Sequence, residues 1–182
     1  MTPLITEQEL SAYTGAFAAD QTGTRQVYAQ AASEIVRDFL RYDPNEKEYV
    51  SYFDGSGTKS ISLGIKPVSV VASVEVLEGG IWVIKPVAEF YVREHFLYWS
   101  TLAFPAGDAN IRVTFTAGYA AIDIPGVMKI TALRIGGVLA SEQDGNIGIT
   151  SKSFGETGSR VFINSRFDRY LEPLETYRIH GI

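Results

Sequence analysis

The residues that could do chemistry in this chain are few, and the first candidates stand in one short acidic and glycine-rich run. Asp54-Gly55-Ser56-Gly57 has the residue types of a phosphate cradle or a nucleophilic serine, but neither G-x-G-x-x-G nor G-K-[ST] surrounds it. The residues that follow have a strand pattern, and glycines adopt the positive φ of tight turns readily. The run therefore predicts a hairpin turn.

Histidines and carboxylates give no stronger signal. The chain has only two histidines, His95 in a predicted strand and His180 in the last three residues. This pattern favours a buried or surface role for each over a two-histidine metal or acid-base site. Acidic residues are spread thinly, for example at Glu46, Glu48 and Glu172, and no spacing places two carboxylates together. The sequence therefore predicts no catalytic residue, no metal and no cofactor, and we expect a protein that is not an enzyme.

Composition excludes several classes of protein. The 182 residues carry a net charge of -5, which repels phosphate backbones and disfavours sequence-specific nucleic-acid binding. The same sign would suit a channel wall that lets DNA pass without sticking. The absence of cysteine removes disulfides and thiolate chemistry. No Lys or Arg precedes Arg25, and the longest stretch without a charged residue runs for 13 residues, so we expect neither a signal peptide nor a membrane span.

Helical patterns occupy the first part of the chain. Thr6 followed by Glu9 is a capping box, which predicts a short helix from about Glu7 to Tyr13. A second helix is expected between Thr24 and Asp43-Pro44. Its predicted buried stripe consists of Val27, Ala31, Ile35 and Phe39, widened by Tyr28, Ala32 and Leu40.

From Glu48 the period changes to two, and β-branched and aromatic residues dominate. The turn signals between the runs predict three locally paired hairpins in an antiparallel sheet or small sandwich. The expected pairs are Tyr49–Phe53 with Lys59–Leu63, Val70–Leu77 with Ile81–Ile84, and Phe90–Tyr98 with Asn110–Thr116.

The last third returns to helical spacing. Pro125 suits the first turn of a third helix, which we expect to end near Glu142. It is followed by a glycine- and serine-rich stretch, residues 144–159, which predicts a mobile loop or arm. Ser165 and Asp168 are candidate caps of a final helical segment, which Pro173 should kink or break. The predicted fold class is α+β, with a helical core from residues 1–47 and 120–182 and an antiparallel β insertion at 48–119.

Two features of this part predict contacts. Gly136 and Gly137 lie inside the third helix, where each glycine costs about 0.5–1 kcal/mol relative to alanine. Close approach of another helix, within the subunit or between neighbouring subunits, would offset that cost; a local kink is the alternative. The final segment carries large apolar residues, which either pack back on the same subunit or are held for a partner's groove. They are Phe162, Phe167, Tyr170, Leu171, Leu174 and Tyr177.

The order of elements resembles the head-tail connector, or adaptor, proteins of long-tailed bacteriophages and prophages. The resemblance covers some 150 residues. It is carried by the helix ending in residues 31–40 (AASEIVRDFL), the run Tyr52–Gly57, the strand ending Ser73-Val74-Glu75-Val76, the run 113–119 (VTFTAGY), Ile124-Pro125 opening a helix with Lys129, and a glycine/serine loop before an aromatic tail at Tyr170 and Tyr177.

This resemblance implies a structural role in a virion neck. Such proteins are made in the host cytoplasm, form a ring below the portal protein, by family resemblance a dodecamer, extend the DNA channel and meet a stopper or tail-completion protein. No catalytic residues come with it. The resemblance favours portal docking for the six large apolar residues of the final segment.

Two other functions remain open at this stage. A stopper or tail-completion protein would occupy the next ring and would not bind the portal. From a different class, an aromatic β block would suit a carbohydrate- or peptide-binding module, with Trp82, Tyr98 and Trp99 as stacking residues.

Overall fold

The computed structural model describes residues 2–15, 22–143, 151–153, 159–161 and 167–179. The fold is α+β. The chain divides into a helical unit, Met1–Arg41 with Pro125–Arg178, and a β unit, Tyr42–Ile124 with Ile179–Ile182. The β unit thus extends a few residues beyond the predicted insertion at each end. Within the described part of the chain, no helix combines the length and apolar character needed to cross a membrane.

Helix α1 spans Glu7–Thr14 and begins as the sequence predicted. The Thr6 hydroxyl accepts a hydrogen bond from the Glu9 backbone N–H (3.1 Å), and the Thr6 N–H donates to the Glu9 carboxylate (2.7 Å). Both orphan donors of the first turn are therefore satisfied, and the capping box is confirmed. The helix stops at Gly15, whose φ of 81° suits glycine.

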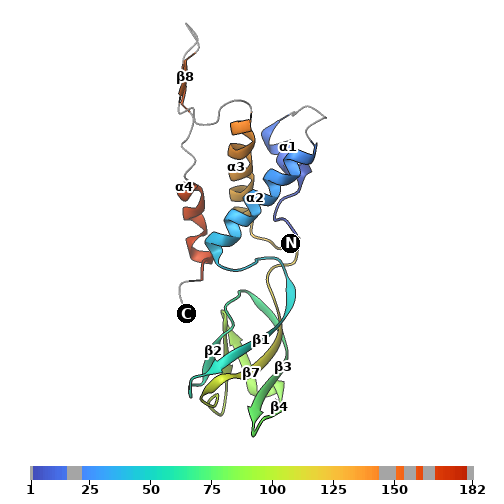
Figure 1. Cartoon of the computed structure of the whole chain (residues 1–182), viewed down its shortest axis with the longest axis vertical. Coiled ribbons are helices and arrows are strands. Elements are labelled where there is room, and N and C mark those ends of the chain that lie inside the picture. Colours follow the sequence, from blue (N-terminus) through green and yellow to red (C-terminus); the bar gives the residue numbers. More distant parts are fainter. Residues whose placement is uncertain (1, 16–21, 144–150, 154–158, 162–166, 180–182) are drawn as a thin grey trace. The chain divides into compact units, whose positions relative to one another are not determined.

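Helix α2, Thr22–Leu40, and helix α3, Gly126–Gln143, pack against each other in the helical unit (Figure 1). The predicted buried stripe of α2 is partly wrong, because Val27 is 61% exposed. The residues that face the core share another side of the helix: Ala29, Ala32, Ser33, Val36, Arg37 and Leu40.

Two of these buried residues, Ser33 and Arg37, are polar, so an apolar pattern in the sequence does not identify this face. Ser33 accepts a hydrogen bond from the Leu4 N–H (2.9 Å) and donates to the Ala29 carbonyl (2.6 Å), and Arg37 donates to the carbonyl of Thr2. Buried polar groups are tolerated when they are hydrogen-bonded in this way. The stripe therefore binds the N-terminal segment as well as covering the core.

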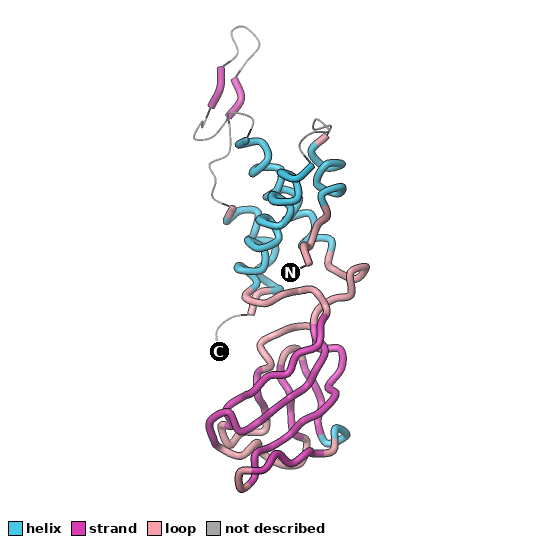
Figure 2. Tube along the Cα trace, turned by 45° about the vertical axis from the view of Figure 1, so that its right-hand side comes forward, coloured by secondary structure: helices cyan, strands magenta, loops and turns pink. Residues whose placement is uncertain are grey.

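The β unit contains two antiparallel sheets, drawn as the magenta strands of Figure 2. The four-stranded sheet has the order β1 (Lys47–Gly55), β7 (Gly107–Ala117), β3 (Val68–Glu78), β4 (Ile81–Lys85). The three-stranded sheet has the order β2 (Ser60–Ser62), β6 (Phe96–Trp99), β5 (Phe90–Arg93), and a short 3-10 helix, η2, spans Val87–Glu89.

Only one of the three predicted hairpins is correct. Strands β3 and β4 pair as expected across Gly79-Gly80. The pairing of Tyr49–Phe53 with Lys59–Leu63 is wrong, because β1 pairs with β7 and β2 with β6. The third pairing is also wrong: Phe90–Tyr98 is itself the β5–β6 hairpin. Strands of both sheets bury one face against a common core, so their period of two does not reveal which sheet each joins.

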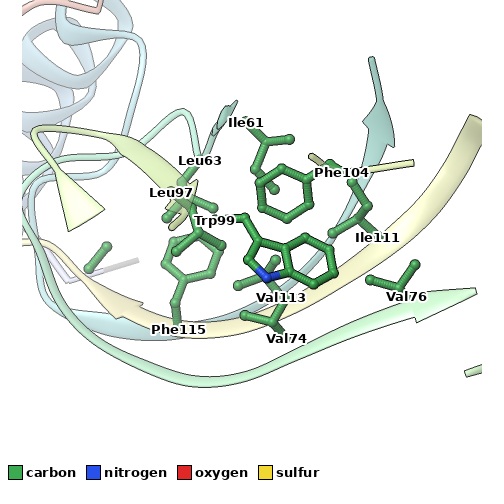
Figure 3. Packing of buried hydrophobic residues seen from close by; sticks show 11 residues of the cluster. Ile61, Leu63, Val74, Val76, Leu97, Trp99, Phe104, Ile111, Val113 and Phe115 are labelled. Carbon is green, nitrogen blue, oxygen red and sulfur yellow. The ribbon is translucent and has the colours of Figure 1, made fainter. Parts of the chain in front are cut away.

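The inner faces of both sheets meet in one apolar core (Figure 3). The four-stranded sheet contributes Val74, Val76, Ile111, Val113 and Phe115, and the other sheet contributes Ile61, Leu97 and Trp99. Phe104, from the loop before β7, is fully buried, with its ring centroid 5.5 Å from that of Trp99. Each such side chain contributes about 1.5–3 kcal/mol by leaving water, which makes this a sandwich with its own core.

Gly118 directly follows β7 and lies in close contact with the segments before β1 and β3. Its φ is 105°, and a Cβ at this position would meet the Asn45 carbonyl oxygen at 2.4 Å. Its N–H donates to the Pro67 carbonyl (2.8 Å), and the next N–H, of Tyr119, donates to the Pro44 carbonyl (2.7 Å). Only glycine satisfies both the backbone angle and the close approach.

The C-terminal part combines a confirmed helix with shorter elements. Helix α3 has the predicted extent. Strand β8 (Ser151–Ser153) lies in the predicted loop, residues 144–159, and pairs with β9 (Ser159–Val161), which begins at the last residue of that loop. The rest of the loop lies outside the described residues, so its mobility stays a prediction. Helix α4, Asp168–Leu171, passes into the 3-10 helix η4, Glu172–Tyr177, with Pro173 in its first turn. No side chain caps α4; Ser165 lies outside the described residues.

Candidate functional site

The candidate histidines of the sequence are not joined by a metal-binding cluster in the part of the chain that the structure describes. The described residues contain no group of three or more His, Asp or Glu side chains that could hold a metal ion. His95 lies in the β5–β6 turn rather than in a strand, with its ring centroid 4.3 Å from that of Phe96. Burial lowers the pKa of His95, the charge of Lys66 lowers it further, and Glu94 opposes both. His180 lies outside the described residues.

The Asp54–Gly57 run is a structural corner. Asn110, itself buried, accepts a hydrogen bond from the Gly55 N–H (2.8 Å) and donates to the Pro105 carbonyl (2.9 Å). The Asp54 carboxylate accepts from the Ala109 N–H (2.7 Å). A Cβ on Gly55 would lie 1.7 Å from the Pro105 carbonyl oxygen, so the glycine is required by space. The run turns the chain from one sheet to the other.

The C-terminal segment, residues 167–179, is held to the helical unit by two of its leucines. Leu171 is 7% exposed and Leu174 is fully buried, and the hydroxyl of Thr131 in α3 donates to the Tyr170 carbonyl (3.2 Å). The Arg178 guanidinium lies over the ring of Phe39 at 5.0 Å. Two of the six proposed docking anchors are therefore used within the subunit, as the alternative stated above expected.

Three of the other docking candidates keep part of their surface exposed. Phe167, Tyr170 and Tyr177 are half-buried, and Phe162 lies outside the described residues. The Arg169 guanidinium lies 4.9 Å from the ring centroid of Tyr170 and donates to its hydroxyl (3.0 Å). This places an aromatic and cationic surface on a segment that is itself anchored. Docking of a partner to this surface stays a prediction.

Gly136 and Gly137 lie at a helix contact within the subunit. A Cβ on Gly136 would meet Leu10 Cδ1 of α1 at 2.9 Å and Ala32 Cβ of α2 at 3.6 Å. At Gly137 the nearest atom would be Thr14 Cγ2, at 3.4 Å. Helix α1 therefore approaches α3 closely at the first glycine and leaves more room at the second.

The aromatic side chains proposed for ligand stacking are largely engaged within the protein. Trp99 is 4% exposed and donates from Nε1 to the Glu89 carboxylate (2.9 Å). Tyr98 is half-buried and stacks on Tyr91 with centroids 5.1 Å apart. The ring of Trp82 has the Arg112 guanidinium over it at 4.9 Å. The stacking surface required by a carbohydrate-binding module is therefore not assembled from these three residues.

The Arg112 guanidinium is the centre of a surface that the sequence did not reveal. It forms a two-point ion pair with Glu75 of the neighbouring strand, and the hydrogen bonds to Glu75 and Tyr52 raise the pKa of Arg112. The ring of Tyr52 meets that of Trp82 edge-on at 5.7 Å. These side chains come from all four strands of the sheet: Tyr52 from β1, Arg112 from β7, Glu75 from β3 and Trp82 from β4. Because the strand order brings them together, their positions in the chain gave no signal.

A seam runs between the edge strands of the two sheets. Among the described residues, strand β1 is hydrogen-bonded only to β7 and strand β2 only to β6. A cavity of about 370 Å³ is lined by residues of both strands. The cavity is lined by Tyr52, Phe53, Asp54, Ser56, Ser60, Ile61, Ser62, Leu63 and Gly64. Ile61 and Leu63 belong to the core, while Asp54 and the serines give polar groups.

Comparison with known proteins gives a match in structure alone. No protein-family model matches the sequence, and a comparison with curated proteins finds no match. A chain from the neck of an empty gene transfer agent particle, computed with C6 symmetry, has a TM-score of 0.66 at 12% identity, covering 98% of this chain and 91% of that one. A chain from a native gene transfer agent virion has a TM-score of 0.61 at 14% identity, with coverage of 98% and 91%.

A third solved structure extends the likeness. It is a chain from the neck of the native particle computed with C12 symmetry, with a TM-score of 0.58 at 12% identity, covering all of this chain and 94% of the other. The chain has the fold of these particle proteins. Both the helical unit and the β unit fall within the match, so the β insertion is part of that fold.

Proposed function

We propose that the protein is a structural component of the neck of a tailed, phage-like particle, where it forms an adaptor ring below the portal. The observation that carries this proposal is the likeness in fold over nearly the whole chain to proteins of gene transfer agent particles, two of them from necks. The resemblance in element order to head-tail connectors supports the same role independently of the structure. In this proposal the protein binds no substrate and catalyses no reaction.

The proposed ring surrounds the path of the DNA. The symmetries computed for the similar necks, C6 and C12, support a ring of twelve copies. A net charge of -5 per copy favours passage of DNA without strong binding. The partners are the portal on one side and a stopper or tail-completion protein on the other. The protein is made in the host cytoplasm and acts in the virion.

Portal docking is assigned in this proposal to the exposed surface of the C-terminal segment. Leu171 and Leu174 fix the segment, and Phe167, Tyr170 and Tyr177 supply the aromatic surface that a partner's groove would cover. Aromatic residues commonly dominate the energy of such contacts, and anchoring the segment beforehand lowers the entropy lost on binding.

The test is a binding assay between the purified protein and heads that contain the portal but lack neck proteins. We expect the protein to sediment with these heads and not with heads that lack the portal. The variants Tyr170→Ala and Tyr177→Ala should bind less, whereas Tyr91→Ala, at a tyrosine of the β unit that is 54% exposed, should bind normally.

Two results would contradict parts of the proposal. Binding that requires a preformed adaptor ring would identify the protein as a stopper. Equal binding by all three tyrosine variants would remove the C-terminal segment from the portal contact and leave the ring role in place.

A further inference from the structure

The edge strands β1 and β2 of the β unit line a common cavity, the seam described above, which could receive one more strand. In the described part of the chain, strands β1 and β2 each have a neighbouring strand on one side only, so the outer edge of β1 offers backbone N–H and C=O groups to a further strand, while at the edge of β2 the Ser60 carbonyl accepts from the Thr58 hydroxyl (2.9 Å). The cavity, about 370 Å³, lies within the size range of sites that bind small ligands or short peptide segments. Its lining includes the core residues Ile61 and Leu63 and the polar residues Asp54 and Ser60.

The β8–β9 hairpin, Ser151–Ser153 with Ser159–Val161, is an incomplete sheet. Its two strands of three residues pair with each other and with no other strand in the described part of the chain. An isolated two-stranded hairpin is at best marginally stable in water, and three or more strands are normally needed. The two strands carry Lys152 and Arg160 at paired backbone positions, so the hairpin brings two positively charged residues into its short ladder. A third strand from a partner would stabilise the hairpin, and its charge of +2 suits a partner with negative charge.

The β1 edge has the complementary charge. Residues 42–124 contain six Lys and Arg and ten Asp and Glu, a net charge of -4, whereas the six residues of β8 and β9 carry +2. Glu48 on β1 and Asp54 at the seam are both exposed. None of the ion pairs among the described residues uses either carboxylate.

We propose that the β8–β9 hairpin of one copy of this chain adds to the free edge of β1 in a second copy, in the seam beside β2. The added strand takes up free backbone groups of β1, and the charge of +2 on the two strands comes near the carboxylate of Asp54. A contact between an arm on one copy and an edge on the next is head-to-tail, the type that closes into a ring. The inference rests on the proposed function only in taking several copies to stand side by side.

Cysteine cross-linking tests the contact cleanly, because the natural chain has no cysteine. Protein carrying only Lys152→Cys is mixed with protein carrying only Ser60→Cys and oxidised, both as concentrated free protein and bound to heads. We expect a disulfide-linked heterodimer. The control partner carries Ile84→Cys, at an exposed position of β4, the opposite edge of the four-stranded sheet. We expect little heterodimer with this control.

The outcomes separate the arm contact from the neck role. Heads that bind the protein normally but give no Lys152–Ser60 cross-link, or as much with Ile84→Cys, would overturn the arm contact and leave the proposed function standing. A heterodimer from protein that never binds heads would support the arm contact and count against the neck role. A further sample carries Lys152→Cys and Ser60→Cys in the same chain. If this double variant forms a disulfide within single chains while the mixed single variants form no heterodimer, the proposed contact between copies is overturned.

A charge variant gives a second readout. Asp54→Asn keeps an oxygen for the Ala109 N–H and removes only the charge, so the fold should persist. We expect self-association to weaken by up to about fivefold, which corresponds to about 1 kcal/mol for an exposed ion pair. Unchanged self-association and unchanged salt dependence would argue against the electrostatic part of the contact.

Discussion

Alanine at Gly137 should stabilise the protein, whereas alanine at Gly136 should give no such gain, although the two residues are neighbours in helix α3. Replacing a glycine inside a helix by alanine favours the helix by about 0.8–1.0 kcal/mol. At Gly137 the new Cβ would lie 3.4 Å from Thr14 Cγ2, which is close to an ordinary van der Waals contact. We therefore expect Gly137→Ala to stabilise the helical unit by about 0.5–1 kcal/mol.

At Gly136 the same gain meets a steric cost. The new Cβ would lie 2.9 Å from Leu10 Cδ1, and Leu10 is fully buried, so its side chain cannot move into solvent. Overpacking a core costs about 1–3 kcal/mol, which exceeds the gain in helix propensity. We expect Gly136→Ala to be neutral to destabilising by about 2 kcal/mol, and Gly136→Leu to be worse.

Thermal unfolding followed by the helical circular dichroism signal measures this difference. Each 1 kcal/mol should shift the midpoint by roughly 2–4 °C if the whole chain unfolds together and by roughly 4–8 °C if the helical unit unfolds by itself. The helical signal is suitable because the two units need not unfold together. If Gly136→Ala stabilised the protein as much as Gly137→Ala, the close approach of α1 to α3 would be refuted.

Three further predictions concern the C-terminal segment and the β unit. Leu174→Ala should lower stability by about 2–5 kcal/mol in denaturant unfolding, because Leu174 is fully buried, whereas Tyr177→Ala should cost less; equal losses would contradict the anchoring described. The pKa of His95 in the folded protein lies below its ordinary value of 6.5, so its contribution to stability should be present above pH 6.5 and lost as the pH falls below it. The melting temperature of His95→Gln, measured against pH, should lack this loss. A profile identical to that of the natural protein would count against the prediction. Gly118→Ala should unfold the β unit at lower temperature, because it forces φ of 105° and a contact with the Asn45 carbonyl; an unchanged near-ultraviolet melting curve would show that the turn adapts.

Local signals in the sequence predicted the elements whose cause is local. The capping box at Thr6 and Glu9 fixed the start of α1, Gly79-Gly80 predicted the β3–β4 hairpin, and Pro173 predicted the break after α4. In each case the residue that determines the structure lies within a few positions of its effect. These features could therefore be derived from spacing alone.

The failures share a different cause. The buried face of α2 includes Ser33 and Arg37, whose burial depends on hydrogen bonds to residues about thirty positions earlier. The partners of β1 lie beyond residue 106, so the nearest turn signal pointed to the wrong strand. Such long-range pairings leave no mark on a period of two.

The candidate site was predictable only in outline. The aromatic C-terminal segment could be named from its residue types, but the burial of Leu171 and Leu174 follows from packing on the helical unit. The seam depends on which strands are left at the two sheet edges, and this required the topology. Residues such as Asn110, which builds the corner beside the seam, gave no signal at all.

The most direct test of the central claim is cryo-electron microscopy of portal-containing heads, imaged with and without the purified protein. We predict an added ring of density directly below the portal, into which the helical unit and the β unit each fit as separate bodies. Heads that show no added density at the portal under conditions where the protein is folded and in excess would contradict the account.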